Sequence, residues 1–156
     1  MDLTKKLKMK QEVTYDKSCG IVSVYKNGVS HMTLVVREKA GHWGIPKGHP
    51  ENNESELETA KREFSEETGI VDFDTLPAPL LTSSYDVSYS GRVIKKTVLY
   101  FLARVFHDQV HVPKDEIIGY EWLTFRDALK RVTYLETRKV LEDAENYIIH
   151  NPQLFL

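Results

Sequence analysis

Glutamates crowd one short stretch of this sequence, Gly48 to Ile70, which holds seven of them. If the stretch is helical, Glu63, Glu66 and Glu67 lie on one side of the helix, because successive residues turn by about 100°. Like charges at this spacing cost about a few tenths of a kcal/mol per pair in an isolated helix. A hard divalent cation, which prefers oxygen ligands, would neutralise the three carboxylates. The stretch therefore predicts a site for Mg²⁺ or Mn²⁺.

Such a metal site suits the hydrolysis of phosphate anhydrides. The cation bridges phosphate oxygens, neutralises charge as the bond breaks and lowers the pKa of the attacking water. A carboxylate that does not bind the cation can accept a proton from this water if like-charged neighbours raise its pKa. The turn-rich loop from Gly48 to Asn53 precedes the cluster and can bring a backbone carbonyl close as a further oxygen ligand.

The glutamates need a helix to hold them on one side, and the sequence marks both ends of it. Ser55, followed three residues later by Glu58, forms a capping box, and Gly69 is a typical helix stop. This pattern predicts a helix over Glu56 to Thr68. The inward side of the helix would carry its apolar residues, which are Leu57, Ala60 and Phe64.

The spacing of these residues resembles the signature of the Nudix hydrolases at every defining position. The matching residues, in order, are Gly48, Glu54, Arg62-Glu63-Phe64, Glu66-Glu67 and Gly69-Ile70. A solvated acidic helix, which is the usual meaning of a charge run, would not explain Gly48, Glu54 or the Arg62-Glu63 pair. The resemblance implies an enzyme that hydrolyses a diphosphate linkage in a nucleotide.

The resemblance also implies a role for each acidic residue of the helix. Glu63, Glu66 and Glu67 would bind metal or activate water, and the carbonyl of Gly48 would be a further ligand. The residue that acts as the base differs among members of this family, and Glu63 is our first choice.

Three more residues have roles implied by the same resemblance. Arg62 would hold Glu54 and its loop in place beside the glutamates. Glu116 corresponds by position to a downstream acidic residue that completes the metal site in relatives. An exposed loop charge is an equally good interpretation of Glu116.

Segments outside the signature indicate the substrate. His42 to His49 (HWGIPKGH) and Lys95 to Ala103 (KKTVLYFLA) resemble the Nudix enzymes that split diadenosine tetraphosphate asymmetrically. Tyr134 falls where those enzymes place an aromatic residue. Adenine needs a flat apolar clamp, and Tyr89 and Tyr134 can supply its two sides, because base stacking on aromatic rings is favourable.

The phosphates of such a substrate need positive partners besides the metal. Lys47 and Lys96 can bind phosphate oxygens, and His42 can donate a further hydrogen bond. We therefore expect Mg²⁺-dependent hydrolysis of diadenosine tetraphosphate to ATP and AMP, by attack of water on a phosphorus.

Two kinds of alternative remain. The first is another Nudix hydrolase activity, either removal of pyrophosphate from RNA 5′ ends or hydrolysis of other nucleoside polyphosphates or inositol pyrophosphates. The HWGIPKGH segment and the formal net charge of −2 argue against an RNA substrate. The second is a non-catalytic Nudix-fold sensor of nucleotides, which is disfavoured because every signature carboxylate is present.

Length and composition indicate one ordinary globular domain over 1–156, with 1–11 as a flexible tail. The single Cys19 cannot form an intrachain disulfide, so we expect a buried residue in a reducing compartment. No apolar stretch approaches the roughly 20 residues of a membrane span, and the N-terminus lacks the apolar core of a secretion signal. We expect a cytoplasmic monomer that does not bind membranes.

The rest of the chain predicts strands before and after the acidic helix and two helices at the end. The predicted strands are 20–25 and 32–36, joined through Asn27-Gly28, then 80–89, 93–106 and 117–123. Capping boxes of Thr124 with Asp127 and of Thr133 with Glu136 predict a short helix and a longer one to about residue 149. The predicted fold is α/β (α+β), a mixed sheet with helices on both faces, similar to the α/β/α sandwich of the Nudix fold.

Overall fold

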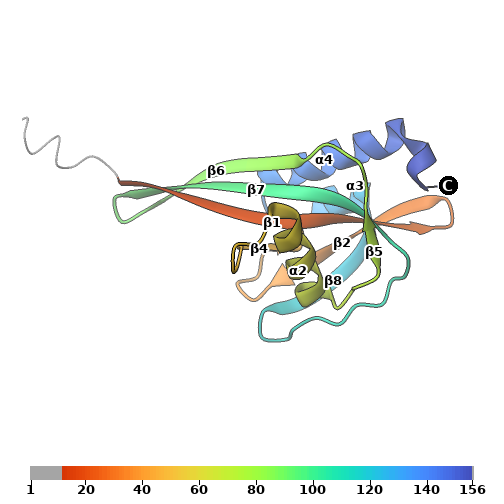
Figure 1. Cartoon of the computed structure of the whole chain (residues 1–156), viewed down its shortest axis with the longest axis horizontal. Helices are drawn as coiled ribbons and strands as arrows, with labels where there is room; N and C mark the ends of the chain where they lie inside the picture. The colour runs from red at the N-terminus through yellow and green to blue at the C-terminus, as the bar shows by residue number, and fades with distance from the viewer. Residues whose placement is uncertain (1–11, 156) are drawn as a thin grey trace, which may run out of the picture.

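A computed structural model describes residues 12–155 of the chain and contains a mixed sheet with helices on both sides (Figure 1). The strands are β1 (Glu12–Asn27), β2 (Ser30–Glu38), β3 (Trp43–Gly44), β4 (Lys47–Gly48), β5 (Phe73–Thr75), β6 (Leu81–Tyr89), β7 (Arg92–Val105) and β8 (Ile117–Thr124). The helices are α2 (Glu56–Thr68), α3 (Phe125–Arg131) and α4 (Leu135–His150), followed by the 3-10 turn η1 (Pro152–Phe155). The predicted fold class is confirmed.

The sheet is built around β1 and β7, which run parallel along most of their length, from Glu12 opposite Arg92 to Tyr25 opposite Val105. The central order is β3-β2-β1-β7-β5, while β4 pairs with β1, β6 with β7 and β8 with β2. All of these other pairings are antiparallel. The predicted strand 20–25 is therefore the inner part of a longer strand that starts at Glu12.

Each face of the sheet packs against a different helical layer, because successive side chains of a strand point to opposite faces. On one face, Ile21 lies in a buried cluster with Phe64 of α2. On the other face, Val22 lies in a second cluster with Leu141 of α4. Cys19 is fully buried in the first cluster, as a small apolar residue would be.

The helix that carries the acidic cluster has the predicted bounds, Glu56–Thr68. Ser55 accepts a hydrogen bond from the N–H of Glu58, and the Glu58 side chain accepts one from the N–H of Ser55, so the capping box is complete. Gly69 ends the helix with φ of 73°, a conformation that favours glycine, and donates its N–H to the Ser65 carbonyl.

The start of α4 differs from the prediction. Thr124 caps α3 as predicted, since its side chain accepts a hydrogen bond from the N–H of Asp127. The predicted capping box of Thr133 with Glu136 is wrong, because α4 starts after Tyr134 and has no side-chain cap. Thr133 instead accepts the N–H of Trp43 at 2.8 Å and donates its own N–H to the Trp43 carbonyl at 3.1 Å. The threonine thus joins α4 to the segment that precedes the acidic helix.

Within residues 12–155, the helices are too short or too polar for any of them to cross a membrane.

Candidate active site

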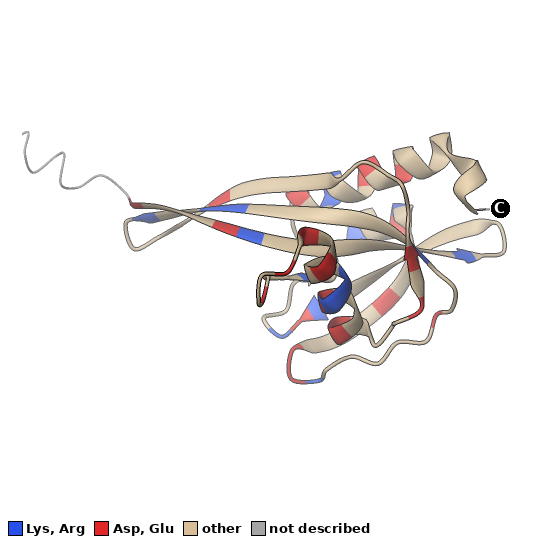
Figure 2. Cartoon of the chain, in the orientation of Figure 1, with Lys and Arg blue, Asp and Glu red and all other residues tan. Residues whose placement is uncertain are grey.

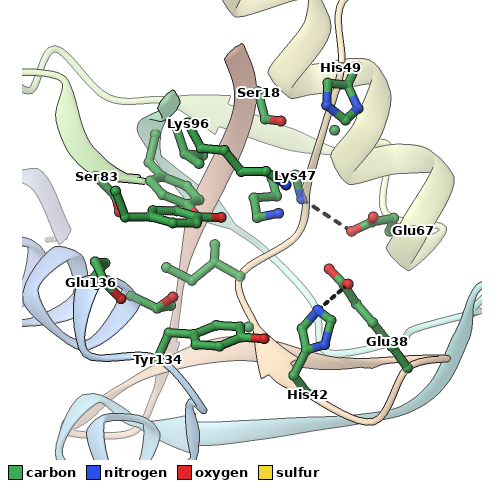
Figure 3. Close-up of a pocket in the computed structure, with 18 of the residues that line it drawn as sticks. Ser18, Glu38, His42, Lys47, His49, Glu67, Ser83, Lys96, Tyr134 and Glu136 are labelled. Atoms are coloured by element: carbon green, nitrogen blue, oxygen red, sulfur yellow. Dashed lines mark hydrogen bonds and ion pairs between the residues drawn. The ribbon is translucent and has the colours of Figure 1, made fainter. Parts of the chain in front are cut away.

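A cavity of about 840 Å³ lies between the sheet, the segment from Glu38 to His49 and the start of α4 (Figure 3). Seven of the predicted site residues line it: His42, Lys47, Gly48, Glu67, Lys96, Glu116 and Tyr134. Residues from five separate parts of the chain therefore meet at one opening. The acidic side of α2 borders the cavity through Glu67.

On α2, acidic residues lie on both sides of a basic segment (Figure 2), and Arg62 of this segment contacts several of the carboxylates. Its guanidinium donates to both carboxylate oxygens of Glu54, at 2.7 and 3.0 Å, and to the backbone carbonyl of His49 at 2.8 Å. It also donates to Glu63 at 3.0 Å and to Glu66 at 3.1 Å. One arginine thus ties the loop after Gly48 to the helix.

The pKa values of Glu54 and Glu63 shift in opposite directions, although both carboxylates contact Arg62. The hydrogen bonds from Arg62 hold the pKa of Glu54 at about 2, so this residue is a permanent anion in the ion pair. Burial raises the pKa of Glu63, and the charges of Glu66 and Glu116 raise it further, while Arg62 opposes the shift. Glu116 is therefore close enough for its charge to act on Glu63.

Gly48 packs directly against the carboxylate of Glu63. It belongs to β4, where it pairs with Cys19 of β1. A methyl group added at Gly48 would overlap the carboxyl carbon and both oxygens of Glu63. The position needs glycine because the helix brings a carboxylate onto the strand at this point.

Glu67 is the most deeply buried carboxylate of the site, with 8% of the residue exposed. It accepts a hydrogen bond from the N–H of Lys47 at 3.2 Å (Figure 3). Burial, followed by the negative charges of Glu63 and Glu38, raises the pKa of Glu67 to about 8. The hydrogen-bond partner of this carboxyl is thus a backbone N–H and not a cationic side chain.

The donor set at this position fits a divalent cation. The pKa values of Glu63 and Glu67 are both raised, so their charged forms are disfavoured in this structure. A bound cation would stabilise these charged forms. Among residues 12–155, no three acidic, histidine or cysteine side chains already converge as a set of metal ligands. Glu63 and Glu66 bond to Arg62 instead, so binding of a cation would require these side chains to turn.

The predicted nucleotide-binding residues divide into two groups. His42, Lys47, Lys96 and Tyr134 line the cavity, and the rings of His42 and Tyr134 lie 5.5 Å apart. The His42 imidazole also pairs with the carboxylate of Glu38 (Figure 3).

Tyr89 does not line the cavity; it lies opposite Arg92 at the end of the β6–β7 hairpin. Tyr85, four residues earlier, lines the cavity and lies opposite Lys96. The sequence contained the signal for this assignment, because a turn at Ser90-Gly91 places Tyr85 across from Lys96.

The chain belongs to the NUDIX domain family, whose pattern matches residues 14–144. It is therefore a Nudix hydrolase, and enzymes of this family generally use divalent metal ions.

Similarity to individual proteins is moderate. The chain is 30% identical over 149 residues to the asymmetrical bis(5′-nucleosyl)-tetraphosphatase of Mus musculus. The aligned region covers 87% of this chain and 97% of that protein. The crystal structure of a C. elegans Ap4A hydrolase binary complex superposes with a TM-score of 0.75 at 25% identity, over 86% of this chain and 98% of that one. A shorter match, 43% identical over 82 residues, is to the mRNA-decapping protein g5R of African swine fever virus, covering 49% of this chain and 32% of that protein.

Gly48→Ala should lower kcat on a nucleotide substrate by about a hundredfold, because the new methyl group pushes Glu63 out of place by an ångström or more. Gly119→Ala, in β8, is the matched control, since a methyl group there would make only ordinary contacts, 3.6 Å from Trp43 and 3.7 Å from Arg37, and Gly119 does not line the cavity. Steady-state kinetics and thermal unfolding of both variants test this prediction. Equal kcat values for the two variants would show that the contact of Gly48 with Glu63 has no role in catalysis.

The free energy of unfolding should fall as the pH rises through the window between the ordinary pKa of Glu67, 4.5, and its raised value of about 8. In this window the unfolded chain has released a proton that the folded protein still binds, so higher pH favours unfolding, by about 1.4 kcal/mol per pH unit. Urea unfolding with EDTA measures the slope. Glu67→Gln should remove this contribution, whereas Glu142→Gln, on the exposed side of α4, should keep it. A wild-type slope retained in Glu67→Gln would contradict the assignment.

Proposed function

We propose that this Nudix hydrolase converts diadenosine tetraphosphate and water to ATP and AMP in the presence of Mg²⁺, with Mn²⁺ as a substitute. The observation that carries the proposal is a single cavity lined by Tyr85 and Tyr134, by Lys47 and Lys96, and by Glu67 of the acidic helix. It offers aromatic rings for a base, cations for phosphates and carboxylates for the reaction. The similarity to the mouse enzyme supports the same substrate.

Adenine would stack between Tyr85 and Tyr134, and the His42 ring packs beside Tyr134 and supports it. The ammonium groups of Lys47 and Lys96 would bind phosphate oxygens, as charge-assisted hydrogen bonds are stronger than neutral ones. His42 could donate a further hydrogen bond to a phosphate through the ring nitrogen that does not contact Glu38. These contacts would hold the phosphates next to this nucleoside beside Glu67.

The residues that would hold the cation are Glu66, Glu67 and Glu116, together with the carbonyl of Gly48, while Glu63 would stay off the cation. When bound, the cation would neutralise charge on the phosphate oxygens and lower the pKa of the attacking water. Glu63 would accept the proton of the attacking water, because burial and like charges raise its pKa toward the range of a useful base. The water oxygen bonds to a phosphorus, and the anhydride bond on the other side breaks. Arg62 would keep Glu63 and Glu54 in position.

RNA with a 5′ phosphate chain is the second candidate substrate. The match to an mRNA-decapping protein over about half of this chain favours it. The formal net charge of −2 gives no general attraction for a polyanion, so we place it second.

Chromatography of the products decides between these substrates. Wild-type protein incubated with Mg²⁺ should release equal amounts of ATP and AMP from diadenosine tetraphosphate. Glu63→Gln should lower kcat at least about a thousandfold, since the variant lacks the proton acceptor, while Glu142→Gln on α4 should be as active as the wild type. Release of pyrophosphate from triphosphorylated RNA, without cleavage of the dinucleotide, would instead support the second candidate.

Tyr85→Ala and Tyr134→Ala should each raise KM for diadenosine tetraphosphate by roughly tenfold, because each removes one stacking surface for the base. Neither variant should change KM for inorganic tetrapolyphosphate, which has no base. Tyr120→Ala, in β8, is the control because Tyr120 is 42% exposed and does not line the cavity. A similar KM increase with both substrates would assign the two tyrosines to structure instead of base binding.

A further inference from the structure

The β6–β7 hairpin continues beyond the cavity as a narrow extension of the sheet. Together with the start of β1, it runs out to the left of Figure 1, past the helices on both faces. Ser90 and Gly91 form its turn, with φ of 48° and 74°. Positive φ at both central residues is typical of the tight type I′ hairpin turn, which fixes the register of the strands behind it.

One face of this hairpin is continuous with the wall of the cavity. Tyr85 opposite Lys96 and Val87 opposite Ile94 are successive cross-strand pairs, and Tyr85, Val87 and Lys96 line the cavity. Alternate residues of a strand share a face. The next pair on this face is therefore Tyr89 opposite Arg92, which the register confirms.

The outer pair repeats the chemistry of the inner one. Tyr85 with Lys96 and Tyr89 with Arg92 each place an aromatic ring beside a cation. The two tyrosines are four residues apart on β6, which corresponds to about 13 Å along the strand. Tyr89 is 73% exposed, so its ring is open to a ligand.

The acidic residues of the adjoining strand do not cancel this positive charge. Glu12 lies 3.6 Å from Arg92, and both side chains are mostly exposed. Such a surface ion pair is weak, so a phosphate or ribose could displace it at little cost. Asp16, which lies opposite Lys96, is paired with His49 at 2.9 Å.

We propose that Tyr89 and Arg92 form an outer subsite for the second nucleoside of a dinucleoside polyphosphate. This inference rests on the proposed function, in which the first base lies between Tyr85 and Tyr134. A substrate with two bases needs a second surface, and the hairpin offers an aromatic ring and a guanidinium on a face continuous with the first site. Tyr89 would stack on the second base, and Arg92 would bind a phosphate or ribose oxygen next to it.

The test compares diadenosine tetraphosphate with adenosine tetraphosphate, which has the same phosphates but one base. Calorimetric titration in a Glu63→Gln background measures both Kd values without turnover. Tyr89→Ala and Arg92→Ala should each raise the Kd of the two-base ligand about five- to tenfold and leave that of the one-base ligand unchanged. Tyr89→Phe should bind like the parent protein, because it keeps an aromatic ring.

Matched controls lie on the opposite face of the same hairpin. Tyr15 is 81% exposed, and Lys95 lies opposite it and next to Lys96 in sequence. Tyr15→Ala and Lys95→Ala should leave both Kd values unchanged. Equal effects from the two faces, equal losses for the two ligands, or no loss in Tyr89→Ala would each overturn the outer subsite.

The test of the outer subsite can be distinguished from the test of the proposed hydrolysis. A wild-type protein that fails to cleave the dinucleotide would refute the proposed reaction, while a selective loss of two-base binding in Tyr89→Ala would still support the subsite. If the outer variants changed neither Kd but slowed hydrolysis of triphosphorylated RNA, the hairpin would be an RNA-binding surface and the inference would be wrong.

Discussion

The ion pair of Arg62 with Glu54 is the interaction on which the site depends. Each carboxylate oxygen of Glu54 receives a hydrogen bond from the guanidinium, which is the bidentate geometry in which arginine binds carboxylates best. The same guanidinium reaches the carbonyl of His49, so the loop between β4 and α2 is fixed at two points. Without these bonds, Gly48 and Glu63 would belong to two segments free to move apart. A lysine could not replace this arginine, because an ammonium group lacks the planar set of donors.

A second constraint holds together the side of the cavity that Tyr134 lines. Thr133 and Trp43 exchange two hydrogen bonds, so the residue before Tyr134 is attached to the residue after His42. The contact between the His42 and Tyr134 rings follows directly from this attachment. The aromatic wall and the loop before the acidic helix thus form one unit, although they are far apart in sequence. These two hydrogen bonds and the pairing of β4 with β1 limit the relative motion of the cavity walls.

Local signals in the sequence predicted the acidic helix well and the aromatic wall less well. The bounds of α2 followed from Ser55, Glu58 and Gly69, which act on neighbouring backbone groups and need no tertiary information. Thr133 has the same local pattern, but the N–H of Trp43, which is distant in sequence, uses its hydroxyl oxygen instead. Tyr89, unlike Tyr85, lies outside the cavity for a related reason. Which tyrosine of β6 faces the cavity depends on the register with β7, and the sequence gives that register only through the turn at Ser90-Gly91.

The burial of Glu67 serves the proposed metal site but costs folding stability when the carboxyl is ionised. A carboxyl with a pKa of about 8 is uncharged over much of the pH range in which a glutamate side chain exposed to water is ionised. Ionising it in the folded protein is unfavourable because the group is buried, because the charges of Glu63 and Glu38 oppose a further negative charge, and because its partner is a backbone N–H. A fold selected for stability alone would place an apolar side chain or an amide here. The retained carboxyl makes sense where a cation takes the place of the proton, and the apolar side of the same helix, through Phe64 and Ala60, supplies the packing that offsets the cost.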